Sequence, residues 1–345
     1  AAAQRTQQIR LGTGVTSLPY HHPFMVADKM TLLDHLTRGR AMLGVGPGLL
    51  ASDAYMIGID PTEQRRMMNE SLDAVMRLLR GETVTMKTDW FELHEARVQL
   101  PPYSSPHLPV AVATSFTPSG PVAAGRHGLG LLSVAGAGNE GFDRTWGWVE
   151  EAAAEHGQTV SRADWRVVVS IHLAETREQA IADLEAGFAR RAYAMDGPNP
   201  GGSISFGPTG RTIAEALENG SGMIVGTPED AIEAFQQLVQ RSGGIGGVLA
   251  LHHEWASVPA IQRSYELWAR YVAPHFQGSA PHLEESRAWF DGSLRTTFAA
   301  SGAAQAKAFQ DAGKDIPEEI AERLRQAEER RAARAAEARA AETDA

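Results

Sequence analysis

The sequence contains no cysteine among its 345 residues. Disulfides, thiolate zinc sites, iron–sulfur clusters and cysteine nucleophiles are therefore all excluded. The sequence also lacks a signal-type start and any apolar run of about 18 residues, the length that a membrane-spanning helix needs. From these absences we expect a cytoplasmic protein that does not span a membrane.

Positive charge is scarce as well. Lys and Arg number 32 against 42 Asp and Glu, which gives a net charge of −10. Nucleic acids and anionic membranes attract basic surfaces, so neither is an expected partner. Apolar residues make up 43% of the chain, enough for a substantial core, and the length allows either one large barrel or two domains.

Several common catalytic motifs are missing. The Gly44–Gly48 run is not a dinucleotide fingerprint, because the third glycine of that motif would fall at Leu49, and no Walker-type lysine follows. The sequence has no GxSxG nucleophile elbow and no HExxH or HxH metal motif. His252 and His253 are adjacent after a predicted strand and point to opposite faces, so they cannot chelate one metal together.

The stretch Ile9–Leu50 predicts a strand, a helix and a second strand. Ile9–Val15 is a short apolar run with two glycines, which favours a buried strand. Apolar residues then recur at three- and four-residue steps over Phe24–Leu36, on one helical face. Ala41–Val45 starts another buried strand and ends in glycines. In parallel α/β folds, glycine at strand ends lets a bulky ligand approach the backbone.

Four segments of this stretch together resemble the luciferase-like flavin monooxygenases. They are Leu11-Gly12-Thr13-Gly14-Val15, Leu18-Pro19-Tyr20-His21-His22-Pro23, Leu33-Asp34-His35-Leu36-Thr37-Arg38-Gly39-Arg40 and Leu43-Gly44-Val45-Gly46-Pro47-Gly48. Four linked segments in one order make the match specific. The resemblance covers roughly residues 2–268 and implies an α/β fold, the (β/α)8 TIM barrel of the bacterial luciferase type.

The remaining apolar runs bring the predicted parallel strands to six, near residues 9, 41, 109, 128, 166 and 247, alternating with helices. A closed (β/α)8 barrel needs eight strands. Ala1–Thr6 resembles the end of a helix, so we expect the first two barrel strands to be missing from this chain. An open doubly wound sheet is the alternative architecture.

We expect the barrel over residues 1–290 and a charged helical tail over residues 291–345. Asp60 is predicted to cap a helix that begins at Pro61, and Glu82–His107 is predicted to form a hairpin-like insertion. The long glycine-rich segment Gly197–Gly222 is typical of a disordered segment or of a lid that excludes water from a site.

A loop of small residues follows the predicted strand at 109–113. Ser115, Thr117, Ser119 and Gly120 lie between this strand and a helix start, where hydroxyl and backbone N–H groups can hold a phosphate. Simple helix capping by Ser119 is an equal alternative for that residue. The family binds the flavin phosphate in the corresponding loop.

The resemblance also assigns Thr13, Gly46 and Gly48 to the cofactor site. Two residues depart from the pattern of luciferases proper, because Pro47 stands where they carry an arginine and Phe116 where they carry an acid.

His22 is the candidate catalytic residue. It follows the first predicted strand, next to His21, at the face where ligands are expected, and its charge can change near neutral pH. A structural loop histidine before a proline is the alternative. The family's better-known catalytic histidine lies on a strand that this chain is expected to lack.

The resemblance implies that reduced FMN, delivered by a separate flavin reductase, reacts with dioxygen and oxygenates a small apolar substrate. It also implies a homodimer. The segments Ile224–Asp230 and Leu251–Trp255 most resemble the limonene 1,2-monooxygenase branch, which implies epoxidation of a terpene. A deazaflavin-dependent oxidoreductase and a non-catalytic relative are the alternatives.

Overall fold

The computed structural model describes residues 1–115, 117–134, 141–195, 212–220, 222–278, 281–322 and 325–326. The chain divides into two compact units, Ala1–Val272 and Ala273–Ala345. Every strand found in the described residues belongs to the first unit. The boundary predicted at residue 290 falls within the second unit.

Eight strands of the first unit form one sheet in which every pairing is parallel. They are β1 (Leu11–Gly12), β2 (Thr16–Ser17), β3 (Ala41–Gly46), β6 (Val110–Thr114), β7 (Gly130–Val134), β8 (Trp165–Leu173), β9 (Ile224–Gly226) and β10 (Gly247–Leu251). The six predicted strands are confirmed, but the first is divided into β1 and β2, and the short β9 was not predicted.

The order of the strands decides between the two architectures. Neighbours run β1-β3-β6-β7-β8-β10, with β2 also on β3 and β9 also on β8, so the sheet follows the order of the chain. A doubly wound sheet reverses direction at a switch point, whereas a barrel adds each strand beside the previous one. The observed order is therefore that of a (β/α)8 barrel followed over part of its circumference.

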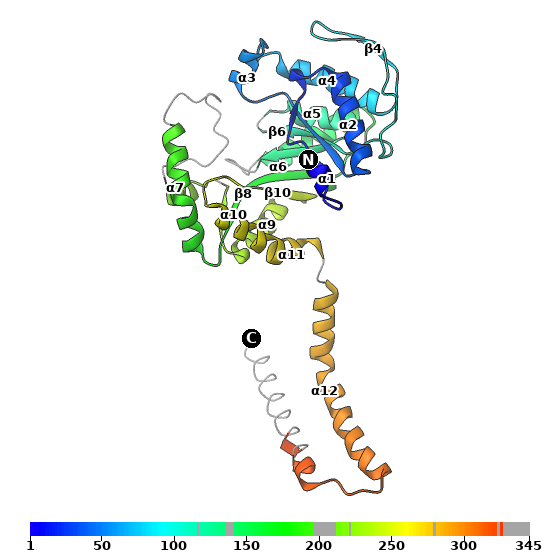
Figure 1. Ribbon diagram of the computed structural model, residues 1–345, viewed down its shortest axis with the longest axis vertical. Helices are drawn as coiled ribbons and strands as arrows, with labels where there is room; N and C mark the ends of the chain where they lie inside the picture. Colours follow the sequence, from blue (N-terminus) through cyan, green and yellow to red (C-terminus); the bar gives the residue numbers. More distant parts are fainter. Residues whose placement is uncertain are drawn as a thin grey trace. The chain divides into compact units, whose positions relative to one another are not determined.

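Helices separate the strands along the chain. They are α1 (Ala2–Arg5), α2 (Pro23–Thr37), α3 (Ala51–Met56), α4 (Gln64–Leu79), α5 (Ser119–His127), α6 (Phe142–Glu155), α7 (Arg177–Met195), α8 (Ile213–Glu218), α9 (Pro228–Arg241) and α10 (Val258–Leu267), with short turns η1 (Leu18–Tyr20), η3 (Arg162–Asp164) and η4 (Trp268–Val272). In Figure 1, α2 and α4 (blue) and α9 and α10 (yellow-green) lie at opposite ends of the sheet.

The sheet has a helix-covered face that carries the main core. Along β8 the side chains alternate, and those of Trp165, Val167 and Val169 are buried against the helices. Trp165 is fully buried, stacks on Trp146 of α6 with 5.4 Å between ring centroids, and donates its indole N–H to Ser133 Oγ at 2.8 Å. Burial of such aromatic surface fixes the helices on this face.

The opposite face, called here the inner face, carries small and half-exposed residues. A Cβ built on Gly44 of β3 would lie 3.1 Å from Leu132 Cδ1 of β7, so both residues belong to this face. The register continues it across β8 and β10, where Val168 pairs with Leu249 and Ser170 pairs with Leu251.

Two helix starts carry similar sequences and fold differently. Thr227 and Asp230 form a capping box at the start of α9. The predicted cap at Asp60 is wrong. Its carboxylate accepts from the N–H and the hydroxyl of Thr62, both at 2.8 Å, and helix α4 begins only at Gln64. The side chain closes a local turn because Asp readily accepts a hydrogen bond from the backbone N–H two residues on, outside a helix as well as at its start.

The hairpin-like insertion is confirmed. Strands β4 (Val84–Lys87) and β5 (Glu92–Ala96) pair antiparallel as a separate two-stranded sheet. The segment that returns to β6 is fixed by the buried Asp34 of α2, whose carboxylate accepts from the N–H and the hydroxyl of Ser104. Helix α3 was not predicted.

Helices α7 and α8 form a second, smaller core beside the carboxyl end of β8. Its buried members are Ala174, Ala180, Leu184, Phe188, Ile213, Ala216 and Val225. Both helices lie in the connection between β8 and β9. Of the predicted lid, residues 197–211 and Ser221 lie outside the described residues, and α8 occupies the helical part that the sequence indicates.

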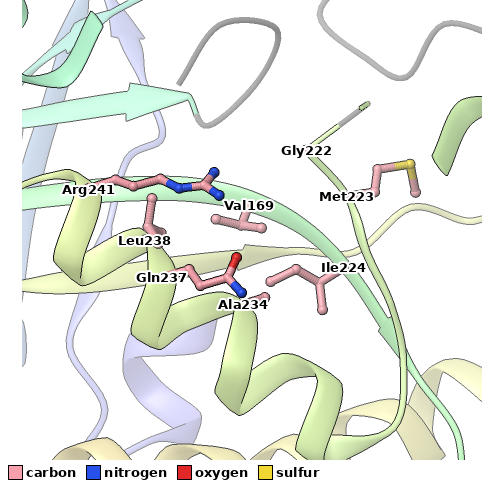
Figure 2. A pocket seen from close by; sticks show the side chains of 8 residues that line it. All are labelled: Val169, Gly222, Met223, Ile224, Ala234, Gln237, Leu238 and Arg241. Atoms are coloured by element: carbon pink, nitrogen blue, oxygen red, sulfur yellow. The ribbon is translucent and has the colours of Figure 1, made fainter. Parts of the chain in front are cut away.

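A cavity of about 140 Å³ lies between β8, β9 and α9. Figure 2 shows Gln237 and Arg241 of α9 beside Val169 of β8. Val169 points to the helix-covered face, so this cavity lies on the other side of the sheet from the inner face.

The second unit contains α11 (Ala273–Gln277) and α12 (Pro281–Asp311) in its described residues. The helical character predicted after residue 291 is present there. No helix in the described part of either unit is long and apolar enough to cross a membrane.

Candidate functional site

The carboxyl ends of the parallel strands bring most of the predicted site residues to one edge of the sheet. Thr13 lies between β1 and β2, Gly46 ends β3, and Ser115 follows β6. Ligands of α/β barrels bind at this edge because the loops there can vary without disturbing the core. Several strands therefore contribute predicted site residues to this edge.

Glycine in β3 lets the chain between β1 and β2 pack directly on the strand. At Gly44 a Cβ would lie 2.2 Å from Thr13 O, and at Gly46 it would lie 3.0 Å from Val15 Cγ2. Larger residues would collide with the backbone at the first position and crowd a side chain at the second. Thr13 and Val15 therefore cover the inner face of β3 at these two glycines.

The hydroxyl of Thr13 is held by the backbone of β3. It accepts from the Gly44 N–H at 3.1 Å and donates to Gly44 O at 2.9 Å. These bonds join the chain between β1 and β2 to the sheet, where ladder pairing is interrupted. The structure thus gives Thr13 a role in the sheet, and its contact with a cofactor stays a prediction.

The loop after β3 is fixed by α4. Gln64 donates its amide N–H groups to Tyr20 Oη at 2.8 Å and to Pro47 O at 3.1 Å. Gly48 has a positive φ of 89°, and a Cβ there would lie 2.4 Å from Tyr20 Oη. Partial burial raises the pKa of Tyr20, which keeps its hydroxyl protonated. Only glycine fits this turn without strain.

The loop after β6 presents an unsatisfied hydroxyl at a helix start. Ser119 is the first residue of α5, and its Oγ is buried without a hydrogen-bond partner among the described residues. Pro118 occupies the cap position, so helix capping by Ser119 is wrong. A Cβ on Gly120 would lie 2.5 Å from Ala113 O, so the start of α5 packs directly on β6.

This arrangement fits an anion. The first-turn N–H groups of a helix have no partners within the helix and attract negative charge. The buried hydroxyl of Ser119 is a further donor without an acceptor among the described residues. Ser115 is exposed, and Thr117 lies between them and accepts at its carbonyl from Thr114 Oγ1. A phosphate would satisfy these donors. Phe116 lies outside the described residues.

The candidate catalytic His22 lies elsewhere on this edge. It is exposed, precedes the first residue of α2, and its ring meets Phe91 edge-on at a centroid distance of 6.1 Å. Among the described residues, no hydrogen bond or ring contact joins it to the loop after β6. Its catalytic role stays a prediction.

A cluster of histidines lies at the carboxyl ends of β8 and β10. His253 Nε2 and Ser170 Oγ are hydrogen-bonded at 2.9 Å. His252 stacks on Tyr265 of α10 with 3.8 Å between centroids. The buried His172 is bonded through Nε2 to Asp183 Oδ2 of α7 at 3.1 Å. The two adjacent histidines therefore have different partners, as their alternation in sequence predicts.

His252 is neutral at physiological pH. Burial lowers its pKa to about 4, and the nearby imidazoles of His172 and His253 lower it in the same direction. Its Nε2 has no hydrogen-bond partner among the described residues.

Comparisons with known proteins show the family to which this chain belongs. Residues 1–244 match the family model of the luciferase-like monooxygenases. The chain belongs to the luciferase-like monooxygenase family. The match includes the glycine-rich β3 and the loop before α5, so the family predicted from the four sequence segments is confirmed.

Two curated relatives are similar to most of the chain. Limonene 1,2-monooxygenase of Rhodococcus erythropolis is 48% identical over 281 residues, 81% of this chain and 72% of that protein. The 4-hydroxyprotoasukamycin monooxygenase of Streptomyces nodosus subsp. asukaensis is 44% identical over 309 residues, 87% of this chain and 82% of that protein. The luciferase-like chain is therefore an oxidoreductase, and its predicted class, a monooxygenase, is confirmed at the level of the family.

Solved structures agree on the fold. The oxygenating constituent of 3,6-diketocamphane monooxygenase from Pseudomonas putida, a complex with FMN, superposes with a TM-score of 0.61 at 24% identity, covering 79% of this chain and 81% of that one. An F420-dependent secondary alcohol dehydrogenase has a TM-score of 0.61 at 19% identity, covering 78% and 80%. These likenesses confirm the TIM-barrel fold class.

Sequence reasoning missed the polar residues of β8. Ser170 and His172 were counted within a β-branched strand and given no role. They stand two residues apart, so they lie on one face of a strand whose other residues from Val167 to Leu173 are apolar. Two polar residues at this spacing in a buried strand are the signal that would have found them.

Proposed function

We propose that this chain uses reduced FMN and dioxygen to oxygenate a small apolar substrate, with the double bond of a cyclic terpene such as limonene as the substrate class. The observation that supports this proposal most directly is the 48% identity to limonene 1,2-monooxygenase over 81% of the chain. The family and the anion-binding loop before α5 support the same proposal.

The residues present fit a flavin phosphate and a flat ring. Ser119 and the first-turn N–H groups of α5 would hold the phosphate, with Ser115, Thr117 and Gly120 completing the loop. Gly46 and Gly48, together with the neighbouring Thr13, would border the ring system, because they lie at the carboxyl end of β3. When bound, the reduced flavin supplies the electrons that activate dioxygen.

The protein's own part is to bind, orient and exclude water. Apolar groups of the inner face would surround the substrate, and a dry site protects reactive species from side reactions. We propose His22 as a group that donates a proton or hydrogen bond at the edge of the site. His22→Gln should lower turnover while His21→Gln, its exposed neighbour, should not. Equal effects of both changes would argue against a special role for His22.

The supply of reduced flavin is proposed to come from a separate reductase in the cytoplasm, and the working unit is proposed to be a homodimer. Both proposals come from the family resemblance. Oxidation of NADH should require an added reductase, and light scattering on the purified chain should give twice the monomer mass. Oxidation without added reductase, or a monomer, would overturn the respective proposal.

A deazaflavin-dependent oxidoreductase is the second candidate. The likeness to the F420-dependent secondary alcohol dehydrogenase favours it, because the same barrel carries that cofactor there. The two functions differ in oxygen use. The FMN proposal requires substrate-dependent consumption of dioxygen, whereas the deazaflavin reaction needs none.

The deciding experiment is a fluorescence titration of the full chain with oxidised FMN and, without air, with reduced FMN, followed by isotopically labelled dioxygen and limonene. We expect tighter binding of reduced FMN and label in the product. Loss of the Ser119 hydroxyl in Ser119→Ala should weaken FMN binding about 10-fold, the usual effect of removing a hydrogen bond to a charged group.

Ser133→Ala is the matched control, since Ser133 lies in the neighbouring strand β7 on the helix-covered face. It should leave FMN affinity unchanged. If neither form of FMN binds and the deazaflavin does, the second candidate replaces the first. If no flavin binds at all, the chain is a non-catalytic relative.

A further inference from the structure

A strip of apolar side chains crosses the inner face near the carboxyl ends of β7, β8 and β10. Val134 pairs with Val168, which in turn pairs with Leu249, and Leu251 follows two residues later on the same face. Val134, Leu249 and Leu251 are 43%, 42% and 43% exposed. Apolar side chains that share an accessible face form the floor of an apolar binding surface.

The strip ends in a hydrogen-bonded polar pair. Ser170 lies opposite Leu251 in the register and two residues beyond Val168, and its Oγ bonds to His253 Nε2 at 2.9 Å. The nearest charged residue along this face of β8 is Arg166, at the other end, where it donates to Asp164 O. The carboxyl end of the strip is therefore polar and its centre is apolar.

The imidazole of His253 is held in place by aromatic packing. It stacks on Trp255 with 4.0 Å between centroids and an angle of 5°. Trp255 meets Phe188 of α7 edge-on at 5.2 Å, and a Cβ on Gly187 would lie 2.1 Å from Trp255 O. Because α7 packs this closely, the position of the His253 ring is set by the second core, which favours a pre-formed polar group.

We propose that the Ser170–His253 pair is the polar end of the substrate pocket, and that it selects apolar ring compounds carrying one neutral oxygen, as a ketone or hydroxyl group, over pure hydrocarbons. This inference rests on the proposed function and narrows the terpene class proposed there to members that carry an oxygen, so that limonene itself is the weaker ligand. A hydrocarbon can form no hydrogen bond with this pair, whereas a ligand oxygen can add one to groups that are already held in place, so the pair favours the oxygenated compound.

The test uses limonene and carvone, a hydrocarbon and a ketone of the same ring skeleton. Binding to the full chain is measured by calorimetry, with and without oxidised FMN, so that no turnover is needed. We expect carvone to bind at least about 10-fold more tightly, the ratio that one well-placed hydrogen bond supplies. Equal affinities, or no binding of either compound, would overturn the inference.

Three variants assign the effect to the pair. Ser170→Ala removes the hydroxyl, and His253→Phe keeps a ring on Trp255 while removing the hydrogen bond. Each should weaken carvone binding about 10-fold and change limonene binding less than about twofold. Ser170→Thr restores a hydroxyl and should restore the preference. An equal loss for both compounds would mean that the pair only shapes the sheet, which overturns the inference.

Ser133→Ala again serves as control, because it removes a serine hydroxyl from the adjacent strand on the opposite face. Its preference for carvone should match that of the unchanged protein, and a lost preference here would also overturn the assignment. Failure of the proposed function is distinguishable. If carvone preference depends on Ser170 and His253 but no dioxygen is consumed, the pocket stands and the monooxygenase proposal falls.

Discussion

The two ends of the sheet build their parts of the site in opposite ways. At β3 and β6 the site depends on absent side chains, because Gly44, Gly46 and Gly120 let neighbouring segments pack directly against the strands. At β8 and β10 it is made by side chains, through His253 bonded to Ser170 and held against an aromatic ring. Close approach is specified by residue type alone, whereas a placed polar group needs partners from several elements.

The largest expected effect tests whether the core of α7 and α8 can unfold independently of β3 and β6. Phe188 is fully buried in the second core of α7 and α8. Phe188→Ala should cost about 3–5 kcal/mol of the stability of that core, as other buried Phe to Ala changes do. Native-state hydrogen exchange should then show faster exchange in α7 and α8, with unchanged protection in β3 and β6. Equal losses throughout would show that the two cores unfold as one.

The next effect tests how closely Thr13 packs on Gly44 of β3. Gly44→Ala places a Cβ 2.2 Å from Thr13 O, a backbone atom that cannot rotate away. We expect a loss of about 3 kcal/mol in the free energy of unfolding by urea. Gly147 in α6 is the control, since nothing lies within 4 Å of its added Cβ. Gly147→Ala should be stabilising by about 0.5–1 kcal/mol. A harmless Gly44→Ala would mean that the sheet can move to make room.

A smaller effect on stability distinguishes the helix cap at Thr227 from the turn at Asp60. Thr227→Ala removes a hydroxyl that accepts the Asp230 N–H at 3.3 Å, and should cost about 1 kcal/mol. Asp60→Ala removes an exposed turn rather than a cap and should cost less than about 0.5 kcal/mol. Both are measured by thermal unfolding. A larger loss at Asp60 than at Thr227 would contradict the assignment of the caps.

A further effect is a dependence of stability on pH, to which each end contributes one neutral histidine. Burial lowers the pKa of His127 in α5 to about 4, as it does for His252 after β10. Below pH about 6.5 the unfolded chain binds protons at both residues while the folded chain does not. Stability from these residues is therefore complete above that pH and is lost as the pH falls towards 4.

Urea midpoints between pH 7 and 4.5 measure this loss. His127→Gln and His252→Gln should each flatten the decline, because Gln has no proton to gain. Around His127, Asp73 opposes the shift, whereas Arg126, Arg80 and His156 add to it. A decline unaffected by either change would assign the acid sensitivity to other groups.

The contrast between the ends also explains which predictions succeeded. The strands and the family were predicted because glycines and β-branched runs are local signals. The cap at Asp60 failed because the same residue types also close a turn, and only the competing donors of Thr62 decide between them. Strand β9 was not predicted because three residues are too few to show the alternation of side chains that indicates a strand.

The sequence by itself determined the order of strands and helices, the positions that must lack a side chain, and the membership of a flavin-associated family. These follow from residue type and spacing along one short stretch at a time. Only the tertiary structure decided that Ser170 meets His253, that Ser119 is left without a partner in the described residues, and that His252 faces Tyr265. Such pairings join residues that the sequence separates by up to 83 positions, and only the register of the sheet and the packing of helices bring them together.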